Sequence, residues 1–178
     1  MNDPSTYFHP DALLRWLSFR PQLETLAIFF FTAVPNREIE GQPTHIPIIT
    51  PVILPNLHHL WFDGVSAFLE ALVRRIATHR LEKLQIEFFN QLVSSLPYLQ
   101  QLLNTTENLR FDHANVWFYE RRVYVRVYSH DRGEAEVFID VISQHLDRQV
   151  SSIAQISNSL IQMFSTVEHL TLEHEEHS

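Results

Sequence analysis

The chain of 178 residues has no cysteine, only three glycines and one lysine, Lys83, against twelve arginines. The lack of cysteine excludes a disulfide framework, thiol catalysis and a thiolate metal site. The scarcity of glycine argues against the glycine-rich loops that cradle phosphates in nucleotide enzymes. A formal net charge of −8 argues against nucleic acid as the main partner. Because 45% of the residues are hydrophobic, the composition indicates a globular domain with its own core.

The N-terminal sequence lacks a cationic start followed by an apolar run, so it does not read as a signal peptide. The most apolar stretch, Leu26 to Val34, is too short to cross a bilayer. We therefore expect a cytoplasmic or nuclear protein that has no membrane partner.

The prolines are unevenly distributed, because eight of the nine lie at or before Pro55. Proline interrupts helix interiors and sheet ladders. Residues 1–55 are therefore predicted to form short elements joined by extended connectors.

The pattern L-x-x-L-x-L recurs along the chain. Its copies are Leu23–Ile28, Leu57–Phe62, Leu81–Ile86, the weaker Thr106–Phe111, and Val167–Leu172. The middle leucines of the central copies are 24 and 25 residues apart, within the range of leucine-rich repeats. Amphipathic helical patterns over 66–78, 91–103 and 146–164 separate the copies. The pattern predicts an α/β, leucine-rich-repeat-like solenoid of about five strand–helix units.

Residues 115–143 break this rhythm with three strand-like runs separated by turn sequences. We predict an antiparallel β insertion there; the alternative is that one of these runs is itself a solenoid strand. The chain then forms a single domain, 1–178. Its parts are a proline-rich region with the first repeat (1–55), regular repeats (56–114), the β insertion (115–143), and the last helix and strand (144–178).

Several phrases extend beyond the repeat pattern. They are Leu54–Val65, Leu81–Leu92, Asn104–Asp112, His145–Val150 and Val167–Glu173. In these phrases the chain resembles the leucine-rich-repeat region of the F-box protein families of mushroom-forming fungi. The resemblance implies a scaffold that recruits a protein, in that family to a cullin–RING ubiquitin ligase. No F-box is evident here, so binding of the ligase adaptor requires an F-box outside this chain. We expect the chain to be a piece of a longer protein or a shortened relative.

The outward-facing positions of the repeat are largely acidic. Parallel strands lie about 4.8 Å apart, so carboxylates in one column repel each other and favour a cationic partner. An ordinary solvated face is the alternative. Trp61 would anchor a partner or pack against residues 43–55. The predicted partner-binding residues are Glu24, His58, Trp61, Asp63, Glu82, Gln85, Glu87, Arg110, Asp112, Glu168 and Glu173.

The histidines do not indicate a metal site. His58 and His59 are adjacent and would point to opposite faces of a strand. His174 and His177 lack the four-residue spacing of a zinc-binding helix. Arginines and tyrosines alternate over 119–132 as in some single-strand nucleic-acid sites, but neighbouring acids favour a solvated hairpin. We expect neither a metal nor a cofactor.

These observations favour a non-catalytic scaffold that binds a protein partner, with a basic partner preferred. One alternative is a small α/β enzyme that uses carboxylate and histidine chemistry. Another is a truncated fragment without independent function, because no polar cap is evident after Leu172.

Overall fold

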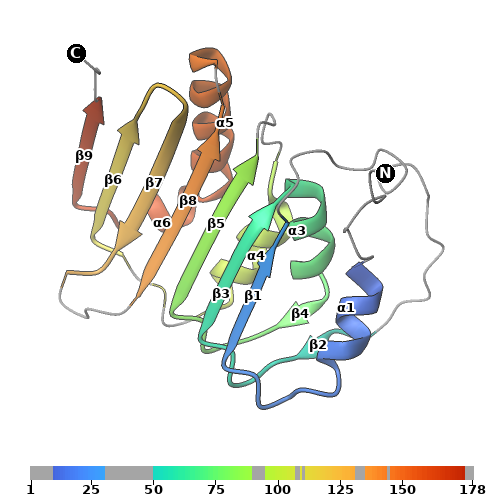
Figure 1. Cartoon of the computed structure of the whole chain (residues 1–178). Helices are drawn as coiled ribbons and strands as arrows, with labels where there is room; N and C mark the ends of the chain where they lie inside the picture. Colours follow the sequence, from blue (N-terminus) through green and yellow to red (C-terminus); the bar gives the residue numbers. More distant parts are fainter. Residues whose placement is uncertain are drawn as a thin grey trace, which may run out of the picture.

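The computed structural model describes residues 10–30, 50–89, 95–106, 109, 111–130, 135–143 and 145–174, excepting the side chains of 162 and 163 (Figure 1). The helices are α1 (Pro10–Leu17), α3 (Ser66–Val73), α4 (Pro97–Asn104), α5 (Leu146–Ser159) and α6 (Ile161–Phe164). The strands are β1 (Thr25–Phe29), β2 (Val52–Ile53), β3 (His59–Gly64), β4 (Ile76–Ala77), β5 (Lys83–Phe89), β6 (His113–Phe118), β7 (Arg122–Tyr128), β8 (Glu136–Ile142) and β9 (His169–His174).

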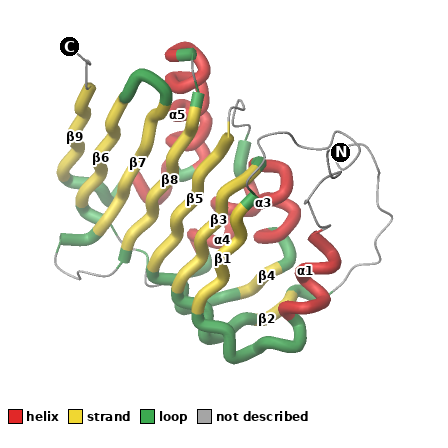
Figure 2. The backbone as a smooth tube through the Cα atoms, viewed as in Figure 1, coloured by secondary structure: helices red, strands yellow, loops and turns green. Residues whose placement is uncertain are grey.

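A seven-stranded sheet with the order β1-β3-β5-β8-β7-β6-β9 forms the centre of the molecule. Every neighbouring pair in it is parallel except the two that involve β7. Strands β2 and β4 pair separately as a small parallel sheet. Helices α3, α4, α5 and α6 lie behind the large sheet in Figure 1, and Figure 2 shows the same two layers. We call the opposite face, which none of these helices covers, the open face.

The alternation of side chains explains why one face of the sheet is buried. Successive side chains of a strand point to opposite faces, and β3, β5 and β7 alternate in burial along their length. In register, Leu60 lies between Leu26 and Leu84, and Phe62 lies beside Ile86. These apolar side chains pack under the helices as one core.

Polar contacts between elements hold the helices to the sheet. The side-chain amide of Gln149 in α5 is buried and donates to the carbonyl of Ser143 at 2.9 Å and to that of Tyr119 at 3.3 Å. Helix α5 is thereby fixed against the turn between β6 and β7. Side-chain hydrogen bonds of this kind satisfy backbone groups that would otherwise be buried without a partner.

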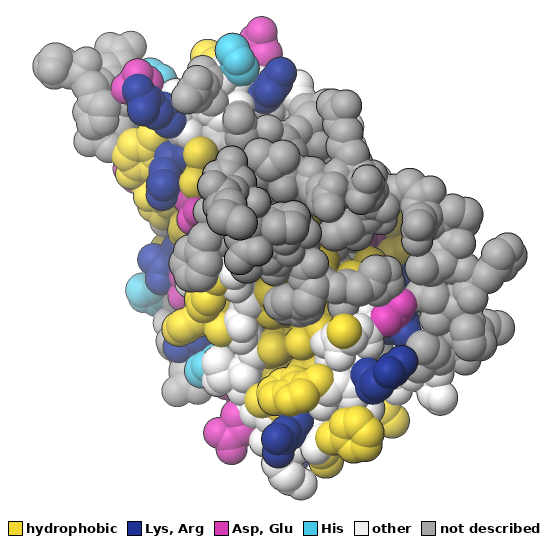
Figure 3. Space-filling view, turned by 45° about the vertical axis from the view of Figure 1, so that its right-hand side comes forward, with side chains coloured by type: hydrophobic (Ala, Val, Ile, Leu, Met, Phe, Trp, Pro, Cys, Tyr) yellow, Lys and Arg dark blue, Asp and Glu magenta, His cyan; other side chains and the backbone are white. Residues whose placement is uncertain are grey.

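Helix α1 lies beside the small sheet and is joined to the end of α3 by an ion pair between Asp11 and Arg75. The helix exposes Trp16, over whose ring the Arg20 guanidinium lies at 5.4 Å, and Phe19 is exposed just after the helix ends. Figure 3 shows hydrophobic side chains at the surface beside lysine or arginine side chains in the lower part of the molecule.

The predicted leucine-rich-repeat-like solenoid is wrong. The first three L-x-x-L-x-L copies do pair side by side as β1, β3 and β5, but the strand next to β5 is β8. Strands β6, β7 and β8 follow one another through short turns, and such turns favour antiparallel pairing. The meander therefore folds back onto β5, and the result is one mixed sheet in place of a uniform stack.

The fourth copy of the pattern, Thr106–Phe111, does not form a strand in its described residues. Strand β6 begins only at His113, although Leu109 and Phe111 are buried. The three strand runs predicted within 115–143 do exist as β6, β7 and β8, but they are part of the main sheet and not an insertion beside it. The helix predicted over 66–78 ends at Val73, because Ile76 and Ala77 enter the small sheet.

Candidate functional site

The open face of the sheet brings together side chains from all seven strands. One row runs straight across the sheet because the strands are in register. It consists of Phe29, Asp63, Glu87, Asp140, Tyr124, Trp117 and Glu173. Asp63, Glu87 and Asp140 are consecutive in this row, and we call them the carboxylate row. Because neighbouring strands are about 4.8 Å apart, their carboxyl groups lie close enough to repel one another.

The carboxylate row is electrostatically unfavourable for ionised groups. Burial, followed by the charge of Glu87, raises the pKa of Asp63 to about 6. Burial also raises the pKa of Asp140 to about 6, against the opposing charge of Arg122 and with a further contribution from Glu87. Desolvation and like charges both disfavour the ionised carboxylate, so a cation placed here would be stabilised.

Asp140 is the most buried member of the row, with 1% of its surface exposed. Its Oδ2 atom forms an ion pair with Arg122 at 3.0 Å. Its Oδ1 atom is also buried and lacks a well-aligned donor among the described residues, although a hydrogen bond from the Val141 amide lowers the pKa of the carboxyl. A buried acceptor without a donor is costly and therefore uncommon. Because this atom is buried, Asp63 and Glu87 are the members of the row that a partner on the open face can reach.

We expect the free energy of unfolding to fall as the pH rises from about 4 to about 6. Folded Asp63 binds its proton more tightly than the unfolded chain does, so deprotonation favours unfolding. The Asp63→Asn variant should show a weaker pH dependence and gain about 1 kcal/mol near pH 7.5, since a full pKa unit is worth about 1.4 kcal/mol and partial exposure weakens the effect. Urea titrations across this pH range measure it. The exposed Glu24→Gln change is the control, and a fall as steep in Asp63→Asn as in the parent would contradict the assignment.

Aromatic rings continue the open face beyond Asp140. The ring of Tyr124 lies 4.5 Å from that of Trp117, 5.5 Å from that of Tyr119 and 5.2 Å from that of Phe138. The hydroxyl groups of Tyr119 and Tyr124 are 3.1 Å apart. Burial and the bond with Tyr119 raise the pKa of Tyr124 to about 12, so this hydroxyl stays protonated at neutral pH. The rings pack on each other as a continuous platform beside the carboxylate row.

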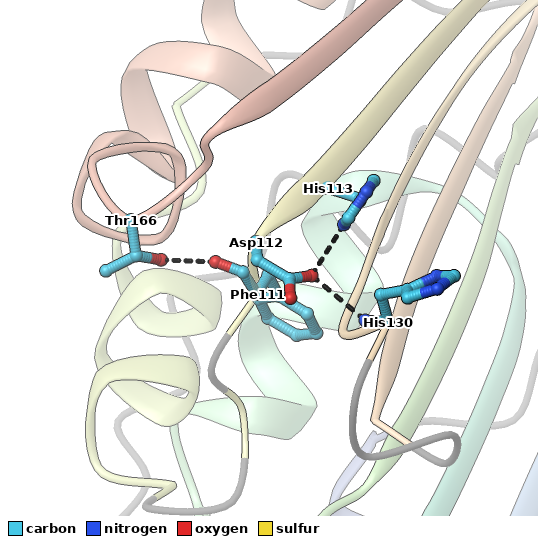
Figure 4. A network of polar contacts seen from close by, with 5 residues as sticks. All are labelled: Phe111, Asp112, His113, His130 and Thr166. Carbon is cyan, nitrogen blue, oxygen red and sulfur yellow. Dashed lines mark hydrogen bonds and ion pairs between the residues drawn. The ribbon is translucent and has the colours of Figure 1, made fainter.

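A second polar cluster lies where β6 begins (Figure 4). The Asp112 carboxylate accepts hydrogen bonds from Nδ1 of His113 at 2.8 Å and from the backbone amide of His130 at 3.0 Å. These bonds lower the pKa of Asp112, with the His113 bond contributing most. The His113 ring stacks on that of His169 at 4.6 Å. Thr166 donates to the carbonyl of Phe111 at 2.7 Å and joins the start of β9 to the same place.

The structure divides the predicted partner-binding residues into two groups. Trp61, Asp63, Gln85, Glu87 and Glu173 lie on the open face, in two adjacent rows. Glu173 is on the edge strand, separated from the carboxylate row by β6 and β7. Arg110 lies outside the described residues.

The remaining predicted residues precede the strands and do not enter these rows. They are Glu24, His58, Glu82, Asp112 and Glu168. The carbonyls of Glu24, His58 and Asp112 each accept two amide hydrogen bonds from the start of the neighbouring strand. Their backbones thus form the end of the sheet, so these residues do not join the open face as predicted. The acid that follows Asp63 and Glu87 in their row is Asp140 and not Asp112.

The sequence interpretation missed Asp140, Tyr124, Trp117 and Phe138 as members of the open face. The signal available for Asp140 was the alternation of 136–142, in which it shares a side with Glu136 and Phe138. That signal becomes informative only when β8 is known to lie beside β5.

Within the described parts of the chain, no group of three or more histidine, aspartate or glutamate side chains is arranged to hold a metal ion. None of the helices described is both long and apolar enough to span a membrane. No protein-family model, curated protein or solved structure matches this chain.

Proposed function

We propose that this chain is a non-catalytic protein-interaction module whose open sheet face binds an arginine-bearing segment of a partner protein. The observation that supports it best is the carboxylate row, in which three acids from neighbouring strands lie side by side. A guanidinium group supplies the missing positive charge and paired donors for the partly exposed Asp63 and Glu87. Binding would lower the free energy of a row whose own charges repel.

Two exposed aromatic side chains favour arginine over lysine as the bound group. Phe29 precedes Asp63 in the same row and is 45% exposed, and Trp61 lies two residues before Asp63 on the same face and is 41% exposed. A planar guanidinium can stack on an aromatic ring while it forms paired hydrogen bonds with a carboxylate. Trp61 and Asp63 together therefore present an apolar surface and an acceptor to one side chain.

The resemblance to F-box proteins gives this proposal a biological form. In a region that recognises substrates, the arginine-bearing segment would belong to a protein that is selected for ubiquitylation. Recruitment to a ligase is a separate prediction that depends on an F-box outside this chain. The binding surface can be tested without it.

The direct test uses an arginine-rich peptide and matched lysine-rich and glutamate-rich peptides, with affinity measured by titration calorimetry. We expect the arginine peptide to bind best and the Asp63→Asn/Glu87→Gln variant to lose about 10- to 100-fold in affinity, since a charge-assisted hydrogen bond contributes about 1.5–3 kcal/mol. The Glu24→Gln/Glu82→Gln variant removes the same charge outside the row and should bind almost as the parent does.

The pH dependence of this binding follows from the groups that face the row. Asp63 faces Glu87 on β5 and the uncharged Phe29 on β1, while Asp140 faces Glu87, Arg122 and Tyr124. A cation binds the ionised acids better, so affinity should rise with pH between about 5 and 7 and fall with added salt. Equal binding of the arginine and glutamate peptides, or equal effects of the two double variants, would contradict the proposal.

A further inference from the structure

Strand β9 is an edge strand with an unusually exposed surface. It is the outermost strand of the sheet, and all six of its residues are exposed. Leu170 and Leu172 are opposite Ala114 and Val116 of β6, so they lie on the helix-side face, yet they are 60% and 67% exposed. Exposed edges with apolar side chains are prone to pair with another strand.

The hydrogen bonds of β9 establish which backbone groups face outward. The amide of His169 donates to the carbonyl of Asp112 at 3.0 Å, so the backbone groups of 169, 171 and 173 face β6. Those of 170, 172 and 174 consequently face away from the sheet, where no described strand pairs with them. A new antiparallel neighbour would form its hydrogen-bonded pairs at Leu170 and Leu172.

The sequence around β9 is complementary to itself when it is read in the opposite direction. Residues 168–174 are Glu-His-Leu-Thr-Leu-Glu-His. In an antiparallel pair with its own copy, centred on Thr171, each leucine is opposite the other leucine and each glutamate is opposite a histidine. The facing pairs are Glu168 with His174, His169 with Glu173, Leu170 with Leu172, and Thr171 with Thr171.

This register also agrees with the backbone geometry. Both members of the Leu170–Leu172 pair have outward-facing amides and carbonyls, as a hydrogen-bonded antiparallel pair requires. A shift of one residue would place an outward-facing group opposite an inward-facing one. A shift of two residues would place Leu170 opposite His174 or Leu172 opposite Glu168, and it would leave one leucine pair instead of two.

We propose that β9 pairs antiparallel with β9 of a second copy of this chain, about a two-fold axis at Thr171. The interface is isologous, because the same strand contributes from both copies. It joins the two seven-stranded sheets edge to edge, places the four exposed leucines beside one another and sets a glutamate opposite a histidine in the pairs that flank them. This inference is independent of the proposed binding of arginine.

Engineered cysteines test the register directly, because the parent chain has none. In Thr171→Cys the two new residues form a non-hydrogen-bonded pair with Cα atoms about 4.5 Å apart, within the range for a disulfide. In Glu173→Cys the two identical positions are four residues apart along the pair, about 14 Å, which is too far. We expect disulfide-linked dimers of the first variant under mild oxidation and far fewer of the second. A mixture of His169→Cys and Glu173→Cys chains should give linked heterodimers.

Sedimentation equilibrium tests the association without any cross-link. The parent chain should show a concentration-dependent dimer, and Leu172→Asp should weaken it at least about tenfold, because it places a charge opposite an apolar side chain. Ile53→Asp is the matched control, since Ile53 is 64% exposed on the small sheet. Circular dichroism checks that each variant is folded. A parent chain that stays monomeric at every concentration, or equal cross-linking of Thr171→Cys and Glu173→Cys, would overturn the proposal.

Discussion

Replacement of Phe62 by alanine is expected to lower the free energy of unfolding by about 3–5 kcal/mol, the usual cost of truncating a fully buried phenylalanine. Phe62, on β3, is fully buried on the helix-side face. Its ring stacks on that of Phe68 at 5.9 Å and meets that of Phe30 edge-on at 6.1 Å. Since small domains are stable by only about 5–15 kcal/mol, this loss would be a large part of the total.

The neighbouring Gly64 shows how little room this cluster leaves. A Cβ atom at Gly64 would lie 2.8 Å from a ring atom of Phe30 and 2.8 Å from a ring atom of Phe62. Close-packed rings cannot yield without moving their own neighbours. A cavity left by Phe62→Ala would therefore close only in part, which supports the upper half of the expected range.

Trp61 provides the matched control on the same strand. Trp61 precedes Phe62 and points to the open face, where it is partly exposed to solvent. Trp61→Ala should lower the free energy of unfolding by about 1 kcal/mol or less, as surface changes usually do. Urea titrations followed by circular dichroism compare the two variants. Equal losses would contradict the assignment of the two faces of β3.

The second large effect is expected for Glu70→Ala, with a loss of about 2–3 kcal/mol, since hydrogen bonds to a charged group contribute about 1.5–3 kcal/mol. The Glu70 carboxylate, in α3, accepts the backbone amides of Tyr98 at 3.0 Å and Leu99 at 2.9 Å. These amides belong to the first turn of α4, where intrahelical acceptors are missing. Burial raises the pKa of Glu70, although the hydrogen bonds from Tyr98 and Leu99 lower it.

The start of α4 depends on its neighbours because its own sequence offers no side-chain cap. The amide of Leu96 donates to Oγ of Ser159 in α5 at 3.1 Å, and Pro97 has no amide hydrogen to satisfy. Glu70 supplies the acceptors for the amides of Tyr98 and Leu99. Its negative charge also interacts favourably with the positive N-terminal end of the helix dipole. Thermal and urea unfolding of Glu70→Ala should be compared with Glu24→Ala, an exposed carboxylate before β1. A Glu70→Ala loss no larger than that of Glu24→Ala would show that the cap contributes little.

Sequence periodicity predicted how the first three strands align, but it did not predict how the later strands pair. The pattern L-x-x-L-x-L predicted that Leu26, Leu60 and Leu84 would align, and they do. The same pattern at Thr106–Phe111 gave a wrong prediction, because buried leucine and phenylalanine side chains need no strand to reach the core. The spacing of apolar residues indicates which side chains are buried. It indicates how strands pair only where those residues lie in a regular strand.

The neighbour of β5 could not be predicted from spacing alone. If the strand–helix repeat continued after β5, a fourth parallel strand would lie beside it. Short turns between the next strands instead allow the antiparallel meander that the structure contains. Which strand lies beside β5 determines the composition of the carboxylate row, because Asp140 joins Asp63 and Glu87 only when that strand is β8. Two of the three row members were therefore predicted from the sequence, and the most buried one was not.

The pairing of β5 with β8 also matters while the chain is being made. Proteins are synthesised from the N-terminus, so β5 is complete long before β8 has left the ribosome. Until then one side of β5 is a free edge that could template aggregation of nascent chains. The chain's single lysine, Lys83, lies on this strand together with Gln85 and Glu87. Polar and charged side chains on a temporary edge discourage wrong partners, so the same residues that line the open face would also protect an unfinished sheet.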